Sequence, residues 1–193
     1  MTKGLVTIFG GSGFIILFES GPQSFESAQR DGATLLAEVA AEKGIKTFVQ
    51  VSAIGADLES KSDYGRTKAE AEEAVRKAVP TATILRPSIV FGPEDGFFNK
   101  FAQMSRFAPA LPAIGGGKTR FQPIYAGDVA DAIALAVDLE GAAGNTYELG
   151  GPRAYTFNEI YDFILKEVDR RRFKISLPFF IMRPAGYILG AVW

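Results

Sequence analysis

Leu5-Val-Thr-Ile-Phe9, followed at once by Gly10-Gly-Ser-Gly13-Phe14-Ile15, is the stretch that decides the fold class. Its first half is apolar and β-branched, which is typical of a buried strand. Gly10 permits a tight turn, and Gly13 lets the backbone approach a pyrophosphate at the start of the following helix. This pattern predicts an α/β protein with a doubly wound parallel sheet and helices on both faces. A strand-to-turn connection without a ligand is the alternative, because a glycine cluster alone is weak evidence.

The chain after this turn is shorter than such a fold requires. Ile16 stands where a third glycine is usual, and a turn signal, Glu19-Ser-Gly-Pro22, follows soon after. Each βαβ unit takes roughly 30 residues, so we expect about two βα units to be absent near Ile15-Ile16. A natural deletion, an engineered deletion or an unobserved segment would each produce this discontinuity. We expect the Cα separation at this junction to exceed the ~3.8 Å of a trans peptide.

The composition excludes several kinds of chemistry. The chain has 193 residues, of which 47% are hydrophobic and 22% charged, with a formal net charge of -1. This predicts one globular domain and argues against nucleic acid as a partner. The chain has no cysteine and no histidine, so we expect no disulfide, no thiol catalysis and no metal site. The first strand begins so early that no signal or transit peptide is expected.

A second informative stretch, Tyr64-Gly-Arg-Thr-Lys68, lies downstream of Ser52. Ser52 closes an apolar run over 48–52 that predicts a strand, so it stands at a carboxyl end, where open α/β sheets bind ligands. The i,i+4 spacing places the phenol of Tyr64 and the ammonium of Lys68 on one helical face. There the cation would lower the pKa of the phenol and make Tyr64 a proton donor near neutral pH. The alternatives are a surface Tyr and Lys at helical spacing, and a strand-capping hydroxyl at Ser52.

The remaining elements follow from periodicity and turn signals. A helix is expected over 24–43, ending at Gly44, with an apolar stripe formed by Phe25, Ala28, Gly32, Leu35, Leu36 and Val39. The helix of Tyr64 should be capped by Ser62 or Asp63 and end before Pro80. Further strands are expected over 46–52, 82–86, 121–125 and 146–149, and further helices over 99–107, 128–137 and 156–169. We interpret the whole chain, 1–193, as a single domain, with 94–125 and 150–193 forming a small C-terminal lobe and an apolar tail.

Two glycine-rich or basic segments have more than one interpretation. Gly115-Gly-Gly117 is interpreted as a flexible turn rather than a phosphate loop, because no helix follows it. Arg170-Arg-Arg172 precedes an apolar tail from Leu177 to Trp193, which is short for a membrane span of about 20 apolar residues. The tail either lies in the membrane interface, with the basic residues at the headgroups, or packs on its own domain or a partner.

These motifs together resemble an atypical or extended short-chain dehydrogenase of the Rossmann type. The resemblance is carried by the glycine-rich turn, by Ser52, by Tyr64 and Lys68, and by Arg86-Pro-Ser-Ile-Val-Phe-Gly-Pro93. More narrowly, the chain is similar to the NAD(P)H-binding Rossmann accessory subunit of respiratory complex I over 85–99, 106–109, 122–125, 127–129 and 147–152. The similarity covers nearly the whole chain, and 86–99 is its most specific part.

The resemblance implies a tightly held NADPH, with NADH as the alternative, and a structural, assembly or stabilising role where the peripheral arm meets the membrane. The pyrophosphate side would be held by Gly10, Ser12, Gly13, Phe14 and Ile15. The ribose and nicotinamide would be held by Ser52, Tyr64 and Lys68, with Pro87 and Ile89 lining the nicotinamide pocket. The implied partners are other complex I subunits. The implied location is peripheral, on the cytoplasmic side of a bacterial inner membrane.

Two other functions stay open. One is a free NAD(P)-dependent reductase or epimerase acting on a sugar-like or carbonyl substrate, in which Tyr64 is the acid/base, Lys68 lowers its pKa and Ser52 orients the carbonyl. The other is a cofactor-free scaffold, which an absent segment would suit. The superfamily often has a second hydroxyl residue after Ser52, whereas this chain has Ala53 and Ile54, which favours a structural role over turnover.

Overall fold

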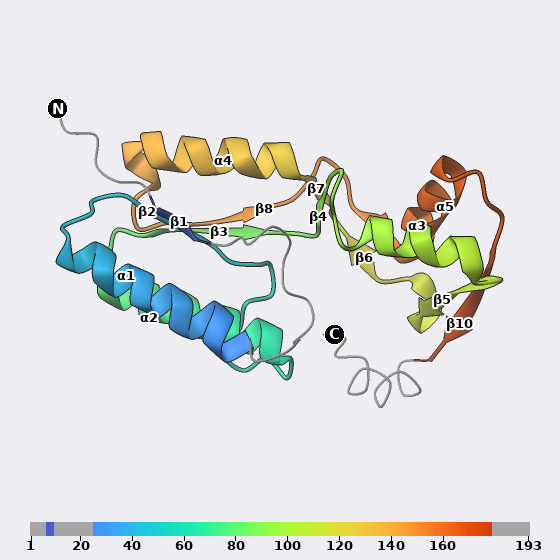
Figure 1. Ribbon diagram of the computed structural model, residues 1–193, viewed down its shortest axis with the longest axis horizontal. Helices are drawn as coiled ribbons and strands as arrows, with labels where there is room; N and C mark the ends of the chain where they lie inside the picture. Colours follow the sequence, from blue (N-terminus) through green and yellow to red (C-terminus); the bar gives the residue numbers. More distant parts are fainter. Residues whose placement is uncertain (1–6, 10–24, 179–193) are drawn as a thin grey trace. The chain divides into compact units, whose positions relative to one another are not determined.

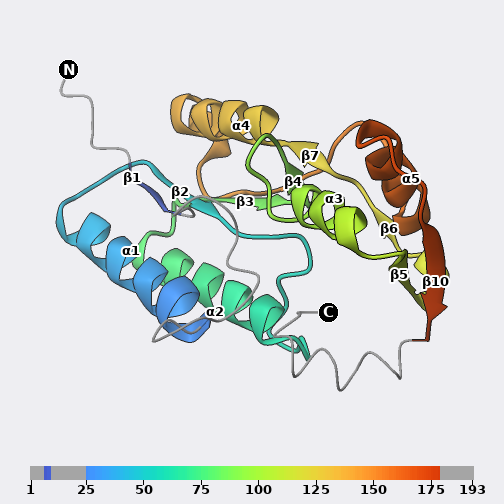
Figure 2. The same cartoon turned by 45° about the vertical axis from the view of Figure 1, so that its right-hand side comes forward.

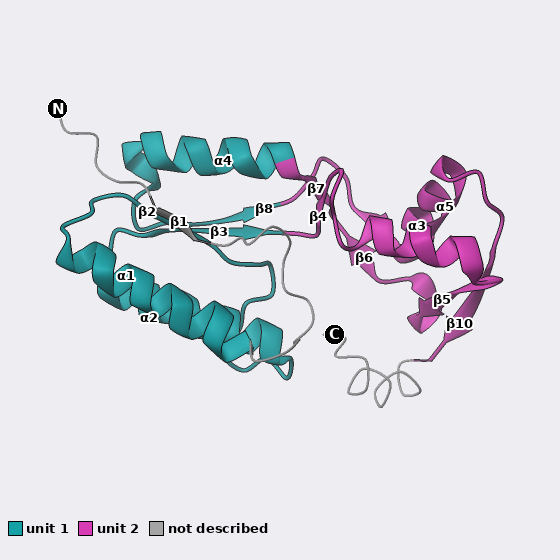
Figure 3. Ribbon diagram, viewed as in Figure 1, with its two compact units in different colours: residues 1–87, 127–149, 192–193 teal, residues 88–126, 150–191 magenta. Residues whose placement is uncertain are grey.

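The protein is described by a computed structural model, which covers residues 7–9 and 25–178. These residues divide into two compact units (Figure 3). The first consists of the described parts of 1–87 and 127–149, and the second of those of 88–126 and 150–191.

The first unit is built on a parallel sheet of four strands in the order β1-β2-β3-β8. The strands are β1 (Thr7–Phe9), β2 (Phe48–Val51), β3 (Thr83–Pro87) and β8 (Thr146–Leu149). All three neighbouring pairs are parallel, with Thr7 opposite Phe48 at one end of the first pair. Parallel neighbours need crossover connections, which helices supply here.

Helices cover both faces of this sheet (Figures 1 and 2). One face carries a π-helical turn, η1 (Glu26–Asp31), which continues into α1 (Gly32–Glu42), and the neighbouring α2 (Asp63–Ala78). The opposite face carries α4 (Ala126–Asp138), followed by the short 3-10 helix η3 (Glu140–Ala142). The predicted doubly wound α/β fold is confirmed.

The position of β1 bears on the predicted absence of two βα units. In the usual doubly wound order, 3-2-1-4-5-6, the first strand is central and two further strands lie outside it. Here β1 pairs with β2 alone among the described residues, and so lies at an edge of the sheet. The order β1-β2-β3-β8 therefore corresponds to strands 1-4-5-6 of the usual order. The Ile15-Ile16 junction itself, and with it the expected Cα separation, lies outside the described residues.

The buried face of α1 differs from the predicted stripe. Leu35 and Val39 are 62% and 42% exposed, whereas the buried positions are the alanines Ala33, Ala37 and Ala40. The π turn over Glu26–Asp31 explains the difference, because its i→i+5 pattern holds more residues per turn and rotates the face that follows. The alanines let α1 approach the sheet and α2 closely, in a cluster that includes Phe48, Ala71, Val75 and Ile84.

The second unit has its own core. Its helices are α3 (Phe98–Phe107), α5 (Phe157–Glu167) and the 3-10 helix η2 (Gly115–Gly117). Its longest strands, β5 (Ala110–Ile114) and β10 (Phe173–Leu177), form a parallel pair. Two shorter pairs are β4 (Val90–Phe91) with β7 (Ile124–Tyr125) and β6 (Arg120–Phe121) with β9 (Tyr155–Thr156). An aromatic cluster joins α3 and α5: Leu111, Phe157, Tyr161 and Leu165 are buried, and Phe97, Phe101, Met104 and Phe121 pack against them.

Two sequence expectations for this unit need correction. The strand expected over 121–125 is two short strands, since Pro123 cannot donate to a ladder and separates them. Leu177 ends β10 rather than opening the tail, and the rest of the tail, residues 179–193, lies outside the described residues. Within 7–9 and 25–178, no helix has the length and apolarity needed to cross a membrane.

Candidate functional site

The carboxyl ends of β2 and β3 are held together by the loop that follows β2. The backbone N–H of Ser52 donates to the carbonyl of Leu85 at 2.7 Å, and that of Ile54 donates to the carbonyl of Pro87 at 3.1 Å. Ser52 and Pro87 therefore lie on neighbouring strands at the same edge of the sheet. This is the edge at which open α/β sheets bind ligands.

The same loop packs on the first turn of α2, at Gly65. The N–H of Asp57 donates to the carbonyl of Gly65 at 3.3 Å. A Cβ atom at Gly65 would lie 2.7 Å from Oγ of Ser60 and 3.2 Å from the carbonyl oxygen of Gly55. The glycine between Tyr64 and Lys68 in the sequence thus lets the loop after Ser52 pack tightly against the helix that carries both.

The predicted N-cap of α2 lies at the expected residue but does not make the expected hydrogen bond. Ser62 occupies the N-cap of α2, as expected, yet its side chain makes no capping hydrogen bond. Its buried Oγ has no hydrogen-bond partner among the described residues.

Tyr64 and Lys68 lie together on α2, as their spacing predicts. The Nζ atom of Lys68 is 5.8 Å from the centroid of the Tyr64 ring. That ring also makes an edge-to-face contact with Phe25, at 5.9 Å between centroids. Thr67, on the next face of the helix, is fully buried and donates its hydroxyl proton to the side-chain oxygen of Gln29 at 3.2 Å.

Burial shifts the pKa values of both side chains. It raises the pKa of the Tyr64 phenol above its ordinary value of 10.0. It also lowers the pKa of Lys68 from 10.5 to about 8, against the smaller, opposing attraction of Glu72. At pH 7 the ammonium form of Lys68 still outnumbers the neutral form by about ten to one.

The expectation that Lys68 lowers the pKa of Tyr64 is therefore wrong. The cost of burying a phenolate exceeds the attraction of an ammonium group that lies 5.8 Å from the ring. Tyr64 is a protonated hydrogen-bond donor at neutral pH, and Lys68 is a charged one.

Several polar atoms near this edge have no hydrogen-bond partner in the described part of the chain. Oγ of Ser52 is buried, with the residue 3% exposed, and makes no hydrogen bond to the described residues. Oε1 of Gln50, two residues earlier on β2, is in the same situation. Lys68 makes no hydrogen bond or ion pair within 7–9 and 25–178. A buried polar group without a partner costs about 1–3 kcal/mol, so these atoms fit a site that is completed by a polar ligand.

The donors suit the ribose and nicotinamide end of a dinucleotide. A hydroxyl, a phenol and an ammonium group can bond the hydroxyls of a ribose and an amide oxygen. Gln50 was not among the residues expected from the sequence. The signal that could have found it is a single polar side chain inside the otherwise apolar run Phe48–Val51.

Other expected site residues are not brought together here. Gly10, Ser12, Gly13, Phe14 and Ile15 lie outside the described residues. Ile89 belongs to the second unit, where its carbonyl accepts a hydrogen bond from Ile124 at 2.9 Å. The candidate site among the described residues therefore has two parts: Ser52, Pro87 and Gln50 at the sheet edge, and Tyr64 and Lys68 on α2, against which the loop after Ser52 packs at Gly65.

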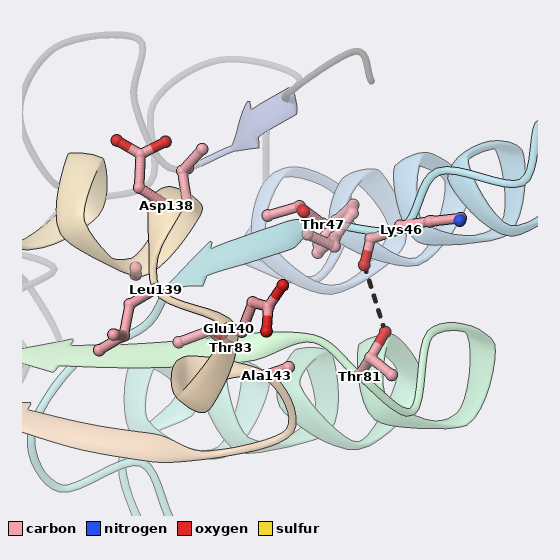
Figure 4. A pocket seen from close by; sticks show the side chains of 11 residues that line it. Lys46, Thr47, Thr81, Thr83, Asp138, Leu139, Glu140 and Ala143 are labelled. Atoms are coloured by element: carbon pink, nitrogen blue, oxygen red, sulfur yellow. Dashed lines mark hydrogen bonds between the residues drawn. The ribbon is translucent and has the colours of Figure 1, made fainter. Parts of the chain in front are cut away.

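A small cavity lies at the other end of the strands (Figure 4). It has a volume of about 90 Å³, and Lys46, Thr81 and Glu140 are among its lining residues. The Thr81 hydroxyl donates to the carbonyl of Lys46 at 3.5 Å, near the amino ends of β2 and β3. The length of the strands separates this cavity from Ser52, so it is not part of the site. In the described part of the chain, no group of three His, Cys, Asp or Glu side chains is placed to hold a metal ion.

Comparison with known protein families gives one match over most of the chain. The model of the NAD dependent epimerase/dehydratase family matches residues 5–150. The family's description names NAD, so a nicotinamide nucleotide is the class of cofactor that this match supports.

Several curated relatives are respiratory-chain proteins by name. The chain is 43% identical over 164 residues to the mitochondrial "NADH dehydrogenase [ubiquinone] 1 alpha subcomplex subunit 9" of Arabidopsis thaliana, covering 84% of this chain and 41% of that protein. It is 33% identical over 171 residues to the mitochondrial "NADH-ubiquinone oxidoreductase 40 kDa subunit" of Neurospora crassa, covering 88% of this chain and 44% of that protein. The chain thus spans about two fifths of the length of these relatives.

Solved structures share the fold. The UDP-glucuronic acid 4-epimerase of Bacillus cereus, solved with UDP-glucuronic acid and NAD, superposes with a TM-score of 0.70 at 18% identity. The match covers 84% of this chain and 59% of that one. At this level of identity the match identifies the Rossmann-like architecture alone.

Proposed function

The chain belongs to the NAD dependent epimerase/dehydratase family, and we propose that it is an accessory subunit of respiratory complex I that binds NADPH in a structural, assembly or stabilising role. The observation that carries the proposal is the 43% identity, over 84% of the chain, to a plant protein named as a subunit of NADH dehydrogenase. Because the chain spans 41% of that protein, the role of the whole relative is carried over as a proposal.

A bound nicotinamide nucleotide is supported by the donors of this site that have no partner within residues 7–9 and 25–178. Lys68 would donate charge-assisted hydrogen bonds to the ribose hydroxyls, and the buried hydroxyl of Ser52 would bond near the nicotinamide, beside Pro87. Ile89 would complete the nicotinamide pocket, and the glycine-rich residues 10–15 would hold the pyrophosphate. When bound, such a nucleotide supplies a hydride donor or acceptor. NADPH rather than NADH is the choice that follows from the resemblance.

A structural role is favoured over turnover by the state of Tyr64. A general acid works best when its pKa lies near the operating pH, whereas burial raises the pKa of Tyr64 above 10.0. Ala53 and Ile54 also provide no second hydroxyl next to Ser52. The residues that would hold a cofactor are thus present without the lowered phenol pKa that proton transfer requires.

The proposal extends to partners and location. The partners would be other complex I subunits, and the chain would lie peripherally on the cytoplasmic side of a bacterial inner membrane. The basic run Arg170-Arg-Arg172 and the apolar sequence after it would let the C-terminal tail contact the membrane surface.

The competing function is a free NAD(P)-dependent reductase or epimerase acting on a carbonyl or sugar-like substrate. It is favoured by the intact pair of Tyr64 and Lys68, which such an enzyme would use for proton transfer.

The size of the native particle tests the two functions against each other. Membranes would be solubilised gently, the particle that carries this chain sized, and its bound nucleotide identified by mass spectrometry. We expect the chain to migrate with a very large NADH-oxidising complex that carries unexchanged NADPH. A small soluble particle that exchanges its cofactor freely and reduces a carbonyl substrate would overturn the proposal in favour of the enzyme.

A further inference from the structure

The strand pair β5–β10 of the second unit is covered on one face by its own helices. Paired residues of a sheet point to the same side, and successive residues alternate between the two sides. Leu111 of β5 is fully buried in the aromatic cluster of α3 and α5. Its partner Lys174 reaches α5, where Nζ donates to the carboxylate of Asp162 at 2.6 Å. Leu111 and Lys174 therefore mark the covered face.

The opposite face of the pair is apolar at every position of the two strands. By the same register it is formed by Ala110 with Phe173, Pro112 with Ile175, and Ile114 with Leu177. Phe173 is 82% exposed and Ile175 is 53% exposed, although both side chains are large and apolar. Parallel strands are usually covered on both faces, so this face is expected to meet something other than water.

A third exposed apolar side chain lies at one end of this face. Phe107 ends α3 and is 90% exposed. It stands three residues before Ala110, the partner of Phe173. Nε of Arg172 donates to the carbonyl of Ser105 at 2.8 Å, which joins the start of β10 to the end of α3. Phe107 and Phe173 therefore lie at the same end of the strand pair.

Basic side chains border this end of the strand pair. A cavity of about 400 Å³ lies beside the connection from α5 to β10, and its lining includes Lys166, Arg170, Arg171 and Arg172, with Leu165, Asp162 and Asp169. Asp162 is already paired with Lys174. In the described part of the chain, none of the four basic side chains forms an ion pair. Their charges are therefore available to an anionic partner.

The exposed apolar area is small for a protein interface. A fully exposed aromatic side chain presents about 200 Å², so the side chains of Phe107, Phe173 and Ile175 together expose on the order of 400 Å². A standard protein interface buries about 800 Å² on each partner. A membrane surface needs no such area, because apolar side chains enter the boundary of headgroups and acyl chains while nearby Lys and Arg bind anionic headgroups.

We propose that the second unit docks on an anionic phospholipid surface through Phe107, Phe173 and Ile175, with Arg170 and Arg171 at the headgroups. This surface belongs to the folded unit, and is distinct from the C-terminal tail that follows it. The inference deepens the proposed peripheral location and rests on the proposed function only for which membrane is met. The contact itself needs neither a nucleotide nor another subunit.

Flotation of the purified full chain with protein-free vesicles tests the inference. The wild type should bind vesicles made of equal parts of phosphatidylcholine and phosphatidylglycerol at least about tenfold more tightly than vesicles of phosphatidylcholine alone. Phe107→Ser should weaken binding to the anionic vesicles about tenfold. The matched control is Phe163→Ser, since Phe163 is 57% exposed on α5, the helix that covers the other face, and should bind like the wild type.

Two further variants test the face and the charges separately. Phe173→Thr combined with Ile175→Thr keeps side chains that favour a strand and should weaken binding by more than tenfold. Arg170→Gln combined with Arg171→Gln changes no apolar side chain and should weaken binding about fivefold for each charge. Circular dichroism shows which variants are folded. Should the threonine variant fail to fold, Phe107→Ser decides, because its side chain is almost fully exposed.

Several outcomes overturn the inference. Equal binding to both kinds of vesicle does so, as does unchanged binding of the folded apolar variants. Binding that is lost with the arginines but kept without Phe107, Phe173 and Ile175 would assign the contact to the basic run and the tail. A dimer in sedimentation that the threonine substitutions dissociate would assign the face to a second copy of the chain.

Failure of the proposed function is a different result. A wild-type chain that binds anionic vesicles through this face, yet never migrates with a large NADH-oxidising complex, overturns the proposed function and supports the inference. A chain that migrates with that complex but does not bind anionic vesicles overturns the inference alone.

Discussion

Replacing Lys68 by methionine should stabilise the nucleotide-free chain, because burial makes the charge of Lys68 costly. The pKa of this lysine falls from 10.5 to about 8 on folding, and each pH unit corresponds to about 1.4 kcal/mol. Below pH 8 both folded and unfolded chains carry the proton, and the penalty is about 3 kcal/mol. Methionine has a similar shape and no charge, so Lys68→Met should raise the free energy of unfolding at pH 7 by up to this amount.

The gain should shrink as the pH rises. Between pH 8 and 10.5 the unfolded chain binds more protons than the folded one, so stability of the wild type increases with pH in this window. At pH 9.5 the remaining penalty is about 1.4 kcal/mol, less than half of its value at pH 7. Above pH 10 the raised pKa of Tyr64 opposes this trend, since the unfolded chain loses that proton first, but Tyr64 is present in both proteins and cancels in their difference.

Urea unfolding at pH 7 and 9.5 measures both effects, after bound nucleotide has been removed by unfolding and refolding. Lys77→Met, at an exposed position of the same helix, is the control and should change stability little at either pH. The reasoning is refuted if Lys68→Met is less stable than the wild type at pH 7, or if its advantage is the same at both pH values. The same variant should retain nucleotide less well, since the proposed ribose donor is gone.

Three further substitutions test separate parts of the structure. Ser52→Ala removes a buried hydroxyl that has no partner among the described residues, so urea unfolding should show an empty chain that is as stable as the wild type or more stable by up to about 1–3 kcal/mol, while mass spectrometry should show less retained nucleotide. Tyr161→Phe removes the hydrogen bond that the phenol donates to the carbonyl of Pro112 at 2.9 Å, and should cost about 1–2 kcal/mol in the same assay. Thr156→Ala removes the capping box with Glu159 at the start of α5 and should cost about 1 kcal/mol, whereas an unchanged midpoint would mean that the box contributes nothing.

Much of the fold could be predicted because its signals are local. The capping box at Thr156, the glycine at Gly44 and the proline at Pro80 limit the helices where they were expected to. The i,i+4 spacing of Tyr64 and Lys68 sufficed to place both side chains together. Each of these features depends on residues within one or two turns, and such patterns survive in any fold that keeps the helix.

What the sequence could not provide depends on tertiary packing. The buried face of α1 differs from the predicted stripe because of a π turn, and no residue pattern in the sequence predicts such a turn. The pKa of Tyr64 moved up because burial outweighs the charge of Lys68, and the degree of burial is a property of the packed chain. The pair of Glu72 and Arg86 joins a helix to a strand 14 residues away, which requires the register of the sheet to be known.

The state of the site in the empty chain also bears on the cofactor-free scaffold. Such a scaffold gains nothing from a buried hydroxyl at Ser52 that lacks a partner among the residues described, or from an ammonium group at Lys68 whose burial costs about 3 kcal/mol. A ligand that supplies hydrogen bonds to both would recover these costs only when bound. A scaffold and a nucleotide-binding subunit therefore predict different combinations of effects on stability and on nucleotide release. In a scaffold, Lys68→Met and Ser52→Ala would leave every measurable property of the assembly unchanged except stability. In a nucleotide-binding subunit, the loss of each group would leave the empty chain as stable or more stable and make the loaded chain release its nucleotide sooner.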